Sequence, residues 1–224
     1  ATIDKALTLL GVDVGDGKAT IAATSGNAVT VDLAAAGDVT FDTINLSGNG
    51  ADYGINIRPG ADVGTFTFTN GDVSGFGYAG IYSSDDGTNA GDTVDAIVIT
   101  DTTMSNNGIG NANGASNIKL FGFAGDATIE DVTIAGGTYA GTGPFTGLPE
   151  YAIDIIGDVA SEGSAGNAAG APPAGTITFN GVTVTGDFEK NAVGLFNFGD
   201  IDNVTVTDLD LSGAEPGDET AVAH

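Results

Sequence analysis

A short pattern of apolar and polar residues recurs six times along the chain. Each copy reads apolar, variable, turn-forming, apolar, variable, apolar, a small and mostly hydroxylated residue, and then Gly or Asn. The copies span residues 41–48, 68–75, 99–106, 129–136, 179–186 and 206–213, so their starting positions are separated by 27, 31, 30, 50 and 27 residues. An internal period of this size is typical of repeat proteins, in which one small structural unit stacks on the next.

A second, shorter apolar segment follows most copies, at residues 53–57, 79–82, 117–120, 152–155 and 193–196. Together the segments predict about three short strands per period, joined by turns and without intervening helices. We expect the first, fourth and sixth positions of each copy to face inward. The third position, which is Thr, Asn, Asp or Gly, is expected to lie at a bend in left-handed geometry. The sequence therefore predicts stacked coils of parallel strands spaced about 4.8 Å apart.

The two ends and the long interval differ from the repeat. Residues 2–10 read as a short helix with Thr2 as the N-cap and Gly11 as the terminator, and this helix is expected to cap the first coil. Residues 18–33 read as an irregular first coil. The 50-residue interval holds two insertions, near 141–150 and 157–175. The predicted boundaries are 1–17 for the cap helix and turn, 18–213 for the stacked coils, and 214–224 for a polar tail that leaves the last coil uncapped.

Composition and charge narrow the function classes. The chain has 224 residues with 37 Gly, no Cys and a formal net charge of −25. A charge of this sign repels phosphate backbones and anionic membrane surfaces, so nucleic acids and membranes are not expected as partners. No apolar run approaches the roughly 18 residues that a membrane-spanning helix needs, so the protein is not expected to insert into a membrane. The absence of Cys removes disulfides and thiolate chemistry.

The coil pattern over residues 18–213 resembles the right-handed parallel β-helix repeat proteins of the pectate-lyase-like superfamily. This resemblance implies an all-β, right-handed parallel β-helix of about six to seven coils, from a secreted or surface-exposed bacterial protein. The superfamily includes polysaccharide lyases, glycoside hydrolases, epimerases, adhesins and phage tailspikes. The resemblance is therefore specific for the fold and says little about the activity.

The lyase branch of that superfamily uses a basic residue to abstract a proton, often with Ca²⁺ to neutralise a uronate. Alignment of the second strands gives an outward column formed by Asn56, Tyr82, Lys119, Asp154 and Phe196. Lys119 between Tyr82 and Asp154, with Arg58 projecting from a nearby bend, is the candidate catalytic group. The alternative is that Lys119 and Asp154 form an ordinary surface ion pair worth under about 1 kcal/mol.

Several oxygen-rich turns make Ca²⁺ a candidate ligand, because this hard cation prefers carboxylate and carbonyl oxygens. The candidate metal ligands are Asp13, Asp16, Asp85, Asp86, Asp92, Asp200 and Asp202. None of these turns matches an EF-hand loop, and each also reads as a hydrated turn. Asp85–Asp86 also offers a carboxylate pair for acid–base work, but the hydrolase branch of the superfamily also uses a nearby His and an Arg–Lys pair, whereas the only His here is the terminal His224 and no Arg–Lys pair exists.

Most Phe residues fall at inward positions, whereas Phe76, Tyr78 and Tyr82 fall at turns or outward positions. Exposed aromatic rings of this kind stack on the faces of sugar rings, so these three residues are candidates for carbohydrate stacking.

The sparse catalytic equipment favours a non-catalytic, extracellular, structural or adhesive solenoid. Its partners are expected to be further copies of the chain docked at the ends of the β-helix, other surface proteins, or a polysaccharide. The alternative is a Ca²⁺-assisted polysaccharide lyase or hydrolase of the same superfamily.

Overall fold

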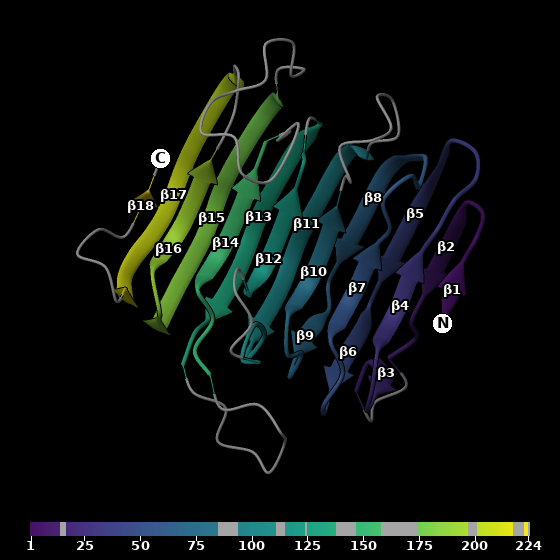
Figure 1. Cartoon of the computed structure of the whole chain (residues 1–224), viewed down its shortest axis with the longest axis horizontal. Coiled ribbons are helices and arrows are strands. Elements are labelled where there is room, and N and C mark those ends of the chain that lie inside the picture. Colours follow the sequence, from purple (N-terminus) through teal and green to yellow (C-terminus); the bar gives the residue numbers. More distant parts are fainter. Residues whose placement is uncertain are drawn as a thin grey trace.

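The fold consists of parallel β-strands stacked side by side (Figure 1). The computed structural model describes residues 1–13, 17–84, 94–110, 115–123, 125–137, 147–157, 174–196, 201–216 and 222–223, and these contain no helix. The N-terminal and C-terminal strands lie at opposite ends of the stack, so the strands follow one another in chain order (Figure 1). The predicted all-β class and the parallel pairing are confirmed.

The strands form two sheets. Sheet A contains, in spatial order, β1 (Thr2–Ile3), β4 (Asn27–Val31), β7 (Tyr53–Ile57), β10 (Ala79–Ser84), β12 (Ser116–Phe121), β14 (Tyr151–Ile156), β16 (Asn191–Phe196) and β18 (Val222–Ala223). Sheet B contains β2 (Leu7–Leu10), β5 (Gly37–Asp42), β8 (Val63–Thr69), β11 (Val94–Ser105), β13 (Asp126–Ala135), β15 (Ala174–Phe188) and β17 (Ile201–Pro216). Three short strands, β3 (Ala19–Ala23), β6 (Ile44–Gly48) and β9 (Asp72–Ser74), extend sheet B, because β3 pairs with β6, and β9 pairs with β6 and β11.

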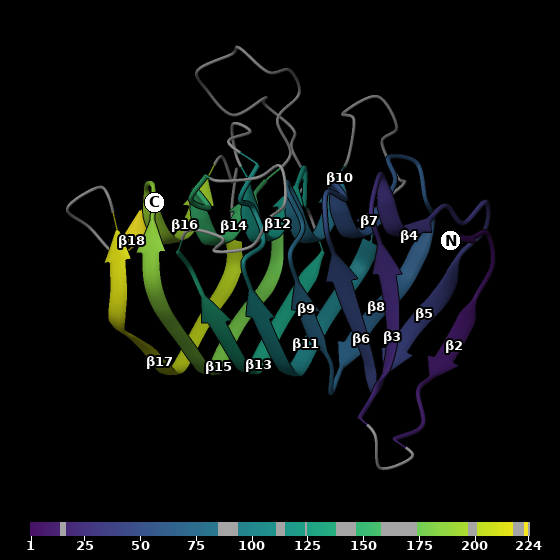
Figure 2. The same cartoon turned by 90° about the horizontal axis from the view of Figure 1, so that it is seen from below.

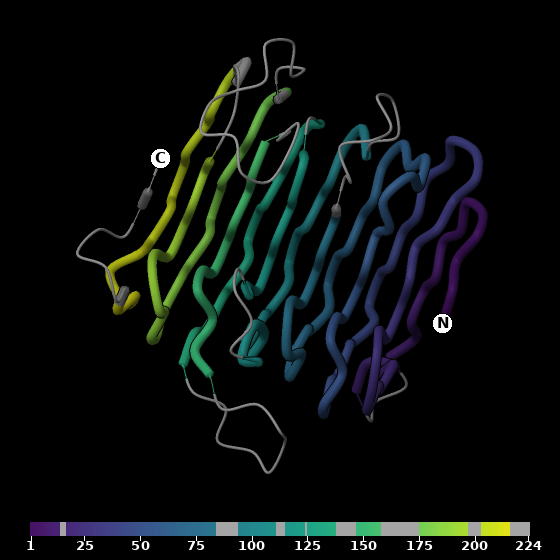
Figure 3. The backbone as a smooth tube through the Cα atoms, in the orientation of Figure 1, coloured from purple at the N-terminus to yellow at the C-terminus, as the bar shows by residue number. Residues whose placement is uncertain are grey.

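The chain passes repeatedly from sheet A to sheet B and back. After β10 in sheet A comes β11 in sheet B, then β12 beside β10, then β13 beside β11, and this order continues to β17. The backbone trace in Figure 3 follows this path along the stack. Figure 2 shows the strands of sheet A as a layer separate from the longer strands of sheet B.

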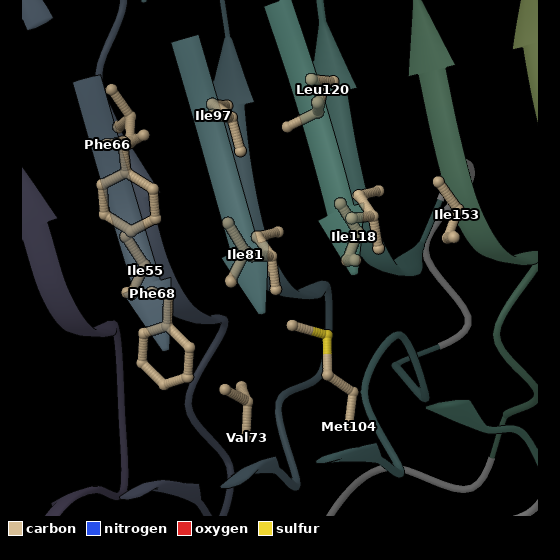
Figure 4. Close-up of a cluster of buried hydrophobic side chains, with 14 of the residues drawn as sticks. Ile55, Phe66, Phe68, Val73, Ile81, Ile97, Met104, Ile118, Leu120 and Ile153 are labelled. Carbon is tan, nitrogen blue, oxygen red and sulfur yellow. The ribbon is translucent and has the colours of Figure 1, made fainter. Parts of the chain in front are cut away.

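The core lies between the two sheets and consists of apolar columns that run along the stack. One column from sheet A contains Ile55, Ile81, Ile118, Ile153 and Val193, all in register and buried. A column from sheet B contains Phe41, Phe68, Ile99, Ile129 and Phe179. Figure 4 shows side chains of both sheets pointing into the shared interior. Full burial of each such side chain stabilises the fold by about 1.5–3 kcal/mol.

The inward positions and the bend of the repeat are confirmed. The first, fourth and sixth positions are buried in the first five copies; in the sixth they lie on β17, the outermost strand of sheet B, and are more exposed. The third positions all have positive φ: Thr43 (58°), Asn70 (55°), Asp101 (49°), Asp131 (51°), Gly181 (63°) and Asp208 (52°). Asn, Asp and Gly adopt this region at the lowest cost, and they occupy the bend in every copy except the first, where Thr43 stands.

The prediction of an N-terminal cap helix is wrong. Thr2–Ile3 forms β1, which pairs with β4, and Leu7–Leu10 forms β2, which pairs with β5 from Leu7↔Val39 to Leu10↔Asp42. The edge of β5 offers Leu7–Leu10 backbone hydrogen-bond partners along one side, and this pairing overrides the weak helix preference of the segment. Gly11 is required because a Cβ there would lie 2.0 Å from the Thr43 carbonyl oxygen.

The segments flanking the repeat also contain strands. Residues 18–33 contain β3 and β4, which lie in register with β6 and β7. At the other end, β17 continues to Pro216 and β18 pairs with β16. Most of the two expected insertions lies outside the described residues.

Candidate functional site: a groove on sheet A

The outward column on sheet A is the frame of the site. Asn56, Tyr82, Lys119 and Asp154 stand in register on β7, β10, β12 and β14, as the sequence predicts. The next member is Gly194, and the prediction of Phe196 there is wrong, because Phe196 pairs with Ile156, two residues further along β16. The ring of Phe196 lies against Gly194, where a Cβ would approach a ring atom to 2.3 Å. Glycine at this step therefore leaves room for the ring.

A groove of about 510 Å³ runs over these strands. Its lining consists of aromatic and apolar side chains and two Lys–carboxylate pairs: Tyr78, Tyr82, Lys119, Phe121, Glu150, Tyr151, Asp154, Ile156, Lys190 and Phe196. Strands β10, β12, β14 and β16 supply most of them, and Tyr78, Glu150 and Lys190 come from the turns that precede β10, β14 and β16.

Two ion pairs form the polar part of the groove. Lys119 Nζ lies 3.3 Å from Asp154 Oδ2, and both residues are buried, at 6% and 1% exposed. Lys190 Nζ donates a hydrogen bond of 2.9 Å to Glu150 Oε2, and this bond raises the pKa of Lys190. The alternative that Lys119 and Asp154 form an exposed surface pair is therefore wrong. Two charges withdrawn from water carry a desolvation cost that an exposed pair does not.

Asp154 has one oxygen that the fold leaves unused. Oδ2 faces Lys119, whereas Oδ1 is buried and accepts no hydrogen bond from any described residue. Burial raises the pKa of Asp154, and the neighbouring ammonium of Lys119 opposes that rise. A buried acceptor without a donor is unfavourable, so this oxygen is poised to receive a donor from outside the protein.

Aromatic rings flank the ion pairs on both sides. The Tyr53 ring centroid lies 5.0 Å from that of Tyr78 and 4.9 Å from that of Tyr82, and Tyr78 and Tyr82 meet edge to face at 5.7 Å. Burial, followed by the neighbouring tyrosines, raises the pKa of Tyr53. Lys119 Nζ lies 5.7 Å from the Tyr78 ring centroid, within cation–π range.

The other end of the groove repeats this arrangement with different residues. Tyr151 and Phe196 meet edge to face at 5.6 Å, and Lys190 Nζ lies 5.7 Å from the Tyr151 ring centroid. Tyr53, Glu150, Tyr151 and Lys190 were not candidates from the sequence. A usable signal was present for Tyr151, which opens the second strand three residues before Asp154.

Two candidates lie away from the groove. Phe76 is fully buried, so the prediction that its ring stacks on a sugar is wrong; its backbone N–H donates to Asn107 Oδ1 in the interior. Arg58 does not line the groove and pairs instead with Asp32, with Nη1 and Oδ2 3.0 Å apart, in an exposed position.

The calcium candidates are mostly outside the described residues. This applies to Asp16, Asp85, Asp86, Asp92 and Asp200, while Asp202 lies on β17 without a described side chain. Asp13 lies in an exposed segment after β2. Within the part of the chain that the structure describes, no three His, Cys, Asp or Glu residues gather as a metal-binding cluster.

Comparison with known proteins gives no match: neither a family model, nor a curated protein, nor a solved structure is significantly similar to this chain. The fold and the groove define it as an all-β protein of stacked parallel strands, compatible with a parallel β-helix. Among the described residues there is no helix of the length and apolarity needed to cross a membrane.

Proposed function

We propose that the chain is a right-handed parallel β-helix whose sheet A groove binds a saccharide chain, and that it acts as a non-catalytic adhesive module at a bacterial surface. The repeated passage of the chain between the two sheets, which always returns it beside the strand of the preceding coil, supports the β-helix. Parallel strands joined by crossovers are right-handed in nearly all known cases, which supports the handedness. The coil pattern and its resemblance to secreted β-helix proteins support the location.

The groove carries the saccharide proposal because it combines stacking rings with hydrogen-bonding groups. Tyr82 on β10 and Phe196 on β16 come from the strands to either side of the Lys119–Asp154 pair, and Tyr78 and Tyr151 complete the aromatic lining. Aromatic faces cover the apolar face of a sugar ring, while charged groups bind its hydroxyls. The volume of about 510 Å³ is within the usual range of small-ligand sites, about 300–1,000 Å³.

A purely structural role explains this groove less well. Well-packed apolar residues in place of a buried ion pair are commonly as stabilising or more so. The interior of the same coils shows that apolar columns are available to this fold. Two ion pairs and an unused acceptor in one concave surface are instead the arrangement expected of a binding site.

A panel of immobilised polysaccharides, scored by surface plasmon resonance, tests the proposal. We expect saturable binding of at least one polymer, weakened about fivefold by Tyr82→Ala, since loss of a stacking ring costs on the order of 1 kcal/mol. Tyr82→Phe keeps the ring, and Thr178→Ala alters the outer face of sheet B, so both should bind like the wild type. Binding of no polymer contradicts the proposal. If the protein instead degrades a polymer, and Lys119→Ala abolishes that degradation, the Ca²⁺-assisted lyase or hydrolase replaces the proposed binding function.

End-to-end self-association is a second candidate function, favoured by exposed apolar residues on both outermost strands of sheet B. On β2, Leu7 and Leu10 are 39% and 62% exposed; on β17, Val204 and Val206 are 41% and 53% exposed. An unpaired strand edge is a template for another strand. We propose that β17 of one copy pairs with β2 of the next, with the exposed Asp208 and Asp210 of β17 attracting the lysines near β2.

Light scattering over a range of protein concentrations tests this association, in millimolar Ca²⁺ and in chelator. We expect the mass to rise with concentration, and Ca²⁺ to promote the rise by neutralising a chain of charge −25. Val206→Lys on β17 should keep the protein monomeric, whereas Thr133→Lys, on the outward side of β13, should not. A constant monomer mass in both buffers contradicts the candidate.

A further inference from the structure

We propose that the groove selects neutral, hydroxyl-rich saccharides over uronates, with the unused Oδ1 of Asp154 accepting a hydrogen bond from a ligand hydroxyl. This inference rests on the proposed saccharide binding and specifies the ligand class of the same groove. It depends on three observations: the pairing of Lys119 and Lys190 with carboxylates, the unused Oδ1 of Asp154, and the net negative charge of the chain.

Both positive charges in the groove are already engaged by carboxylates. Lys119 lies 3.3 Å from Asp154, and Lys190 lies 2.9 Å from Glu150. The two ammonium groups and two carboxylates that line the groove therefore cancel. To bind a uronate, the groove would have to draw a lysine away from a buried carboxylate, which leaves that carboxylate unpaired. The net charge of −25 on the chain adds repulsion at longer range.

The unused oxygen favours a donor and disfavours a second carboxylate. Oδ1 of Asp154 is buried within a residue that is 1% exposed, and no described group donates to it. An ionised carboxylate only accepts hydrogen bonds, so its ligand partner has to be a donor. A sugar hydroxyl supplies one, whereas a uronate carboxylate is a further acceptor and carries like charge. Hydrogen bonds to a charged acceptor are also the stronger ones.

The stacking rings fit the same ligand class. Tyr82 lies on β10, on the far side of Lys119 from Asp154, and Tyr151 lies on β14 three residues before Asp154, so a sugar in the groove has aromatic rings within its lining. Stacking requires an apolar sugar face, which neutral hexose and pentose rings present. Neutral hexose and pentose rings therefore match both the aromatic side chains and the unused carboxylate oxygen of the groove.

Isothermal titration calorimetry of the wild-type protein gives the primary test. The probes are four neutral polymers (glucan, galactan, mannan and xylan) and two polyuronates (polygalacturonate and alginate). We expect at least one neutral polymer to bind at least tenfold more tightly than either polyuronate. Methyl esterification of the polygalacturonate, which removes its charge and keeps its linkage, should strengthen its binding.

Asp154→Asn provides the matched variant, because it keeps the size of the side chain and removes the charge and one acceptor. We expect affinity for the neutral polymer to fall about tenfold and affinity for the polyuronate to stay equal or rise. Polyuronates binding more tightly than every neutral polymer overturns this inference and leaves the saccharide proposal standing. Binding of no polymer overturns the proposed function itself. The comparison of polymers on the wild-type protein decides between these outcomes even if the variant does not fold.

The pH dependence gives a second readout on the folded wild type. Burial raises the pKa of Asp154 above its ordinary 3.8, and Lys119, Glu150 and Lys190 are the charged groups that act on it. As pH falls from neutrality towards 3.8, Asp154 takes up a proton and Oδ1 loses its acceptor charge, so affinity for the neutral polymer should fall. Thr178→Ala, on the outer face of sheet B and away from the groove, should show the same fall in affinity. An affinity that stays constant or rises as pH falls contradicts the role of Oδ1.

Discussion

Lys119→Met is expected to lower the free energy of unfolding by about 3–5 kcal/mol, because it leaves the buried carboxylate of Asp154 without its ion-pair partner. Asp154 is 1% exposed, and Lys119 approaches its Oδ2 to 3.3 Å, while no described group donates to Oδ1. Methionine fills the volume of the lysine stem, so the loss of stability comes from the missing charge and not from a cavity. Urea unfolding followed by far-UV circular dichroism measures it.

The double variant Lys119→Met with Asp154→Asn is the control, since it removes both charges. It should recover most of the lost stability, and the double-mutant cycle then isolates the coupling between the two side chains. A loss below about 1 kcal/mol in Lys119→Met would mean that the pair behaves as an exposed one.

The loss of unfolding free energy in Lys119→Met is expected to depend on pH. Burial raises the pKa of Asp154 in the folded state above its ordinary 3.8. The folded state therefore holds the proton more tightly than the unfolded state, so this carboxyl contributes stability below 3.8 that is lost as pH rises through the raised pKa. Removing Lys119 raises that pKa further. The Lys119→Met defect should accordingly shrink towards acid pH.

Phe76→Ala is expected to lower the free energy of unfolding by about 3–5 kcal/mol, the usual range for truncating a buried Phe. The ring is fully buried and packs against Gly48 and Gly54; a Cβ on Gly48 would lie 2.6 Å from a ring atom. The variant should bind saccharide with wild-type affinity per folded molecule, because Phe76 does not line the groove. Loss of binding with unchanged thermal stability would place the ring in the binding surface instead.

The repeat could be predicted from the sequence because its signals are local. Asp101 and Asp131 mark the bend, since short polar side chains tolerate positive φ, and both positions have it. The apolar positions around them bury the same faces in successive coils. Once the coils are aligned, the column from Tyr82 to Asp154 follows from the spacing alone.

The errors arise where contacts distant in sequence decide the structure. The first ten residues carry a weak helical pattern, but β4 and β5 offer them a sheet edge. Phe76 follows Gly75, which has φ of 80°, and so reads as part of a turn; the chain nevertheless directs its ring inward, where Asn107 accepts its N–H. The predicted position of Phe196 in the outward column is two residues out of register, because Gly194, which occupies that position, has no side chain to mark it.

The candidate site also has one part that could be predicted from the sequence and one part that could not. Lys119 and Asp154 share a strand position in adjacent coils, which the sequence reveals. Glu150 and Lys190 lie 40 residues apart in turns before different strands, and their contact depends on how the intervening chain returns to sheet A. The burial of the Lys119–Asp154 pair could not be predicted either, because the side chains that line the groove around it come from several coils.

The central claim is that the groove on sheet A binds a neutral saccharide, and the protein carries a natural probe of it. The chain has no Trp and only five Tyr, of which Tyr78, Tyr82 and Tyr151 line the groove and Tyr53 contacts two of these rings. The most direct measurement is therefore a titration of the intrinsic tyrosine fluorescence with the neutral polymer panel. A saturable change with at least one polymer, reduced in Tyr82→Ala, is the predicted result. Unchanged fluorescence with every polymer at concentrations up to millimolar would contradict the account.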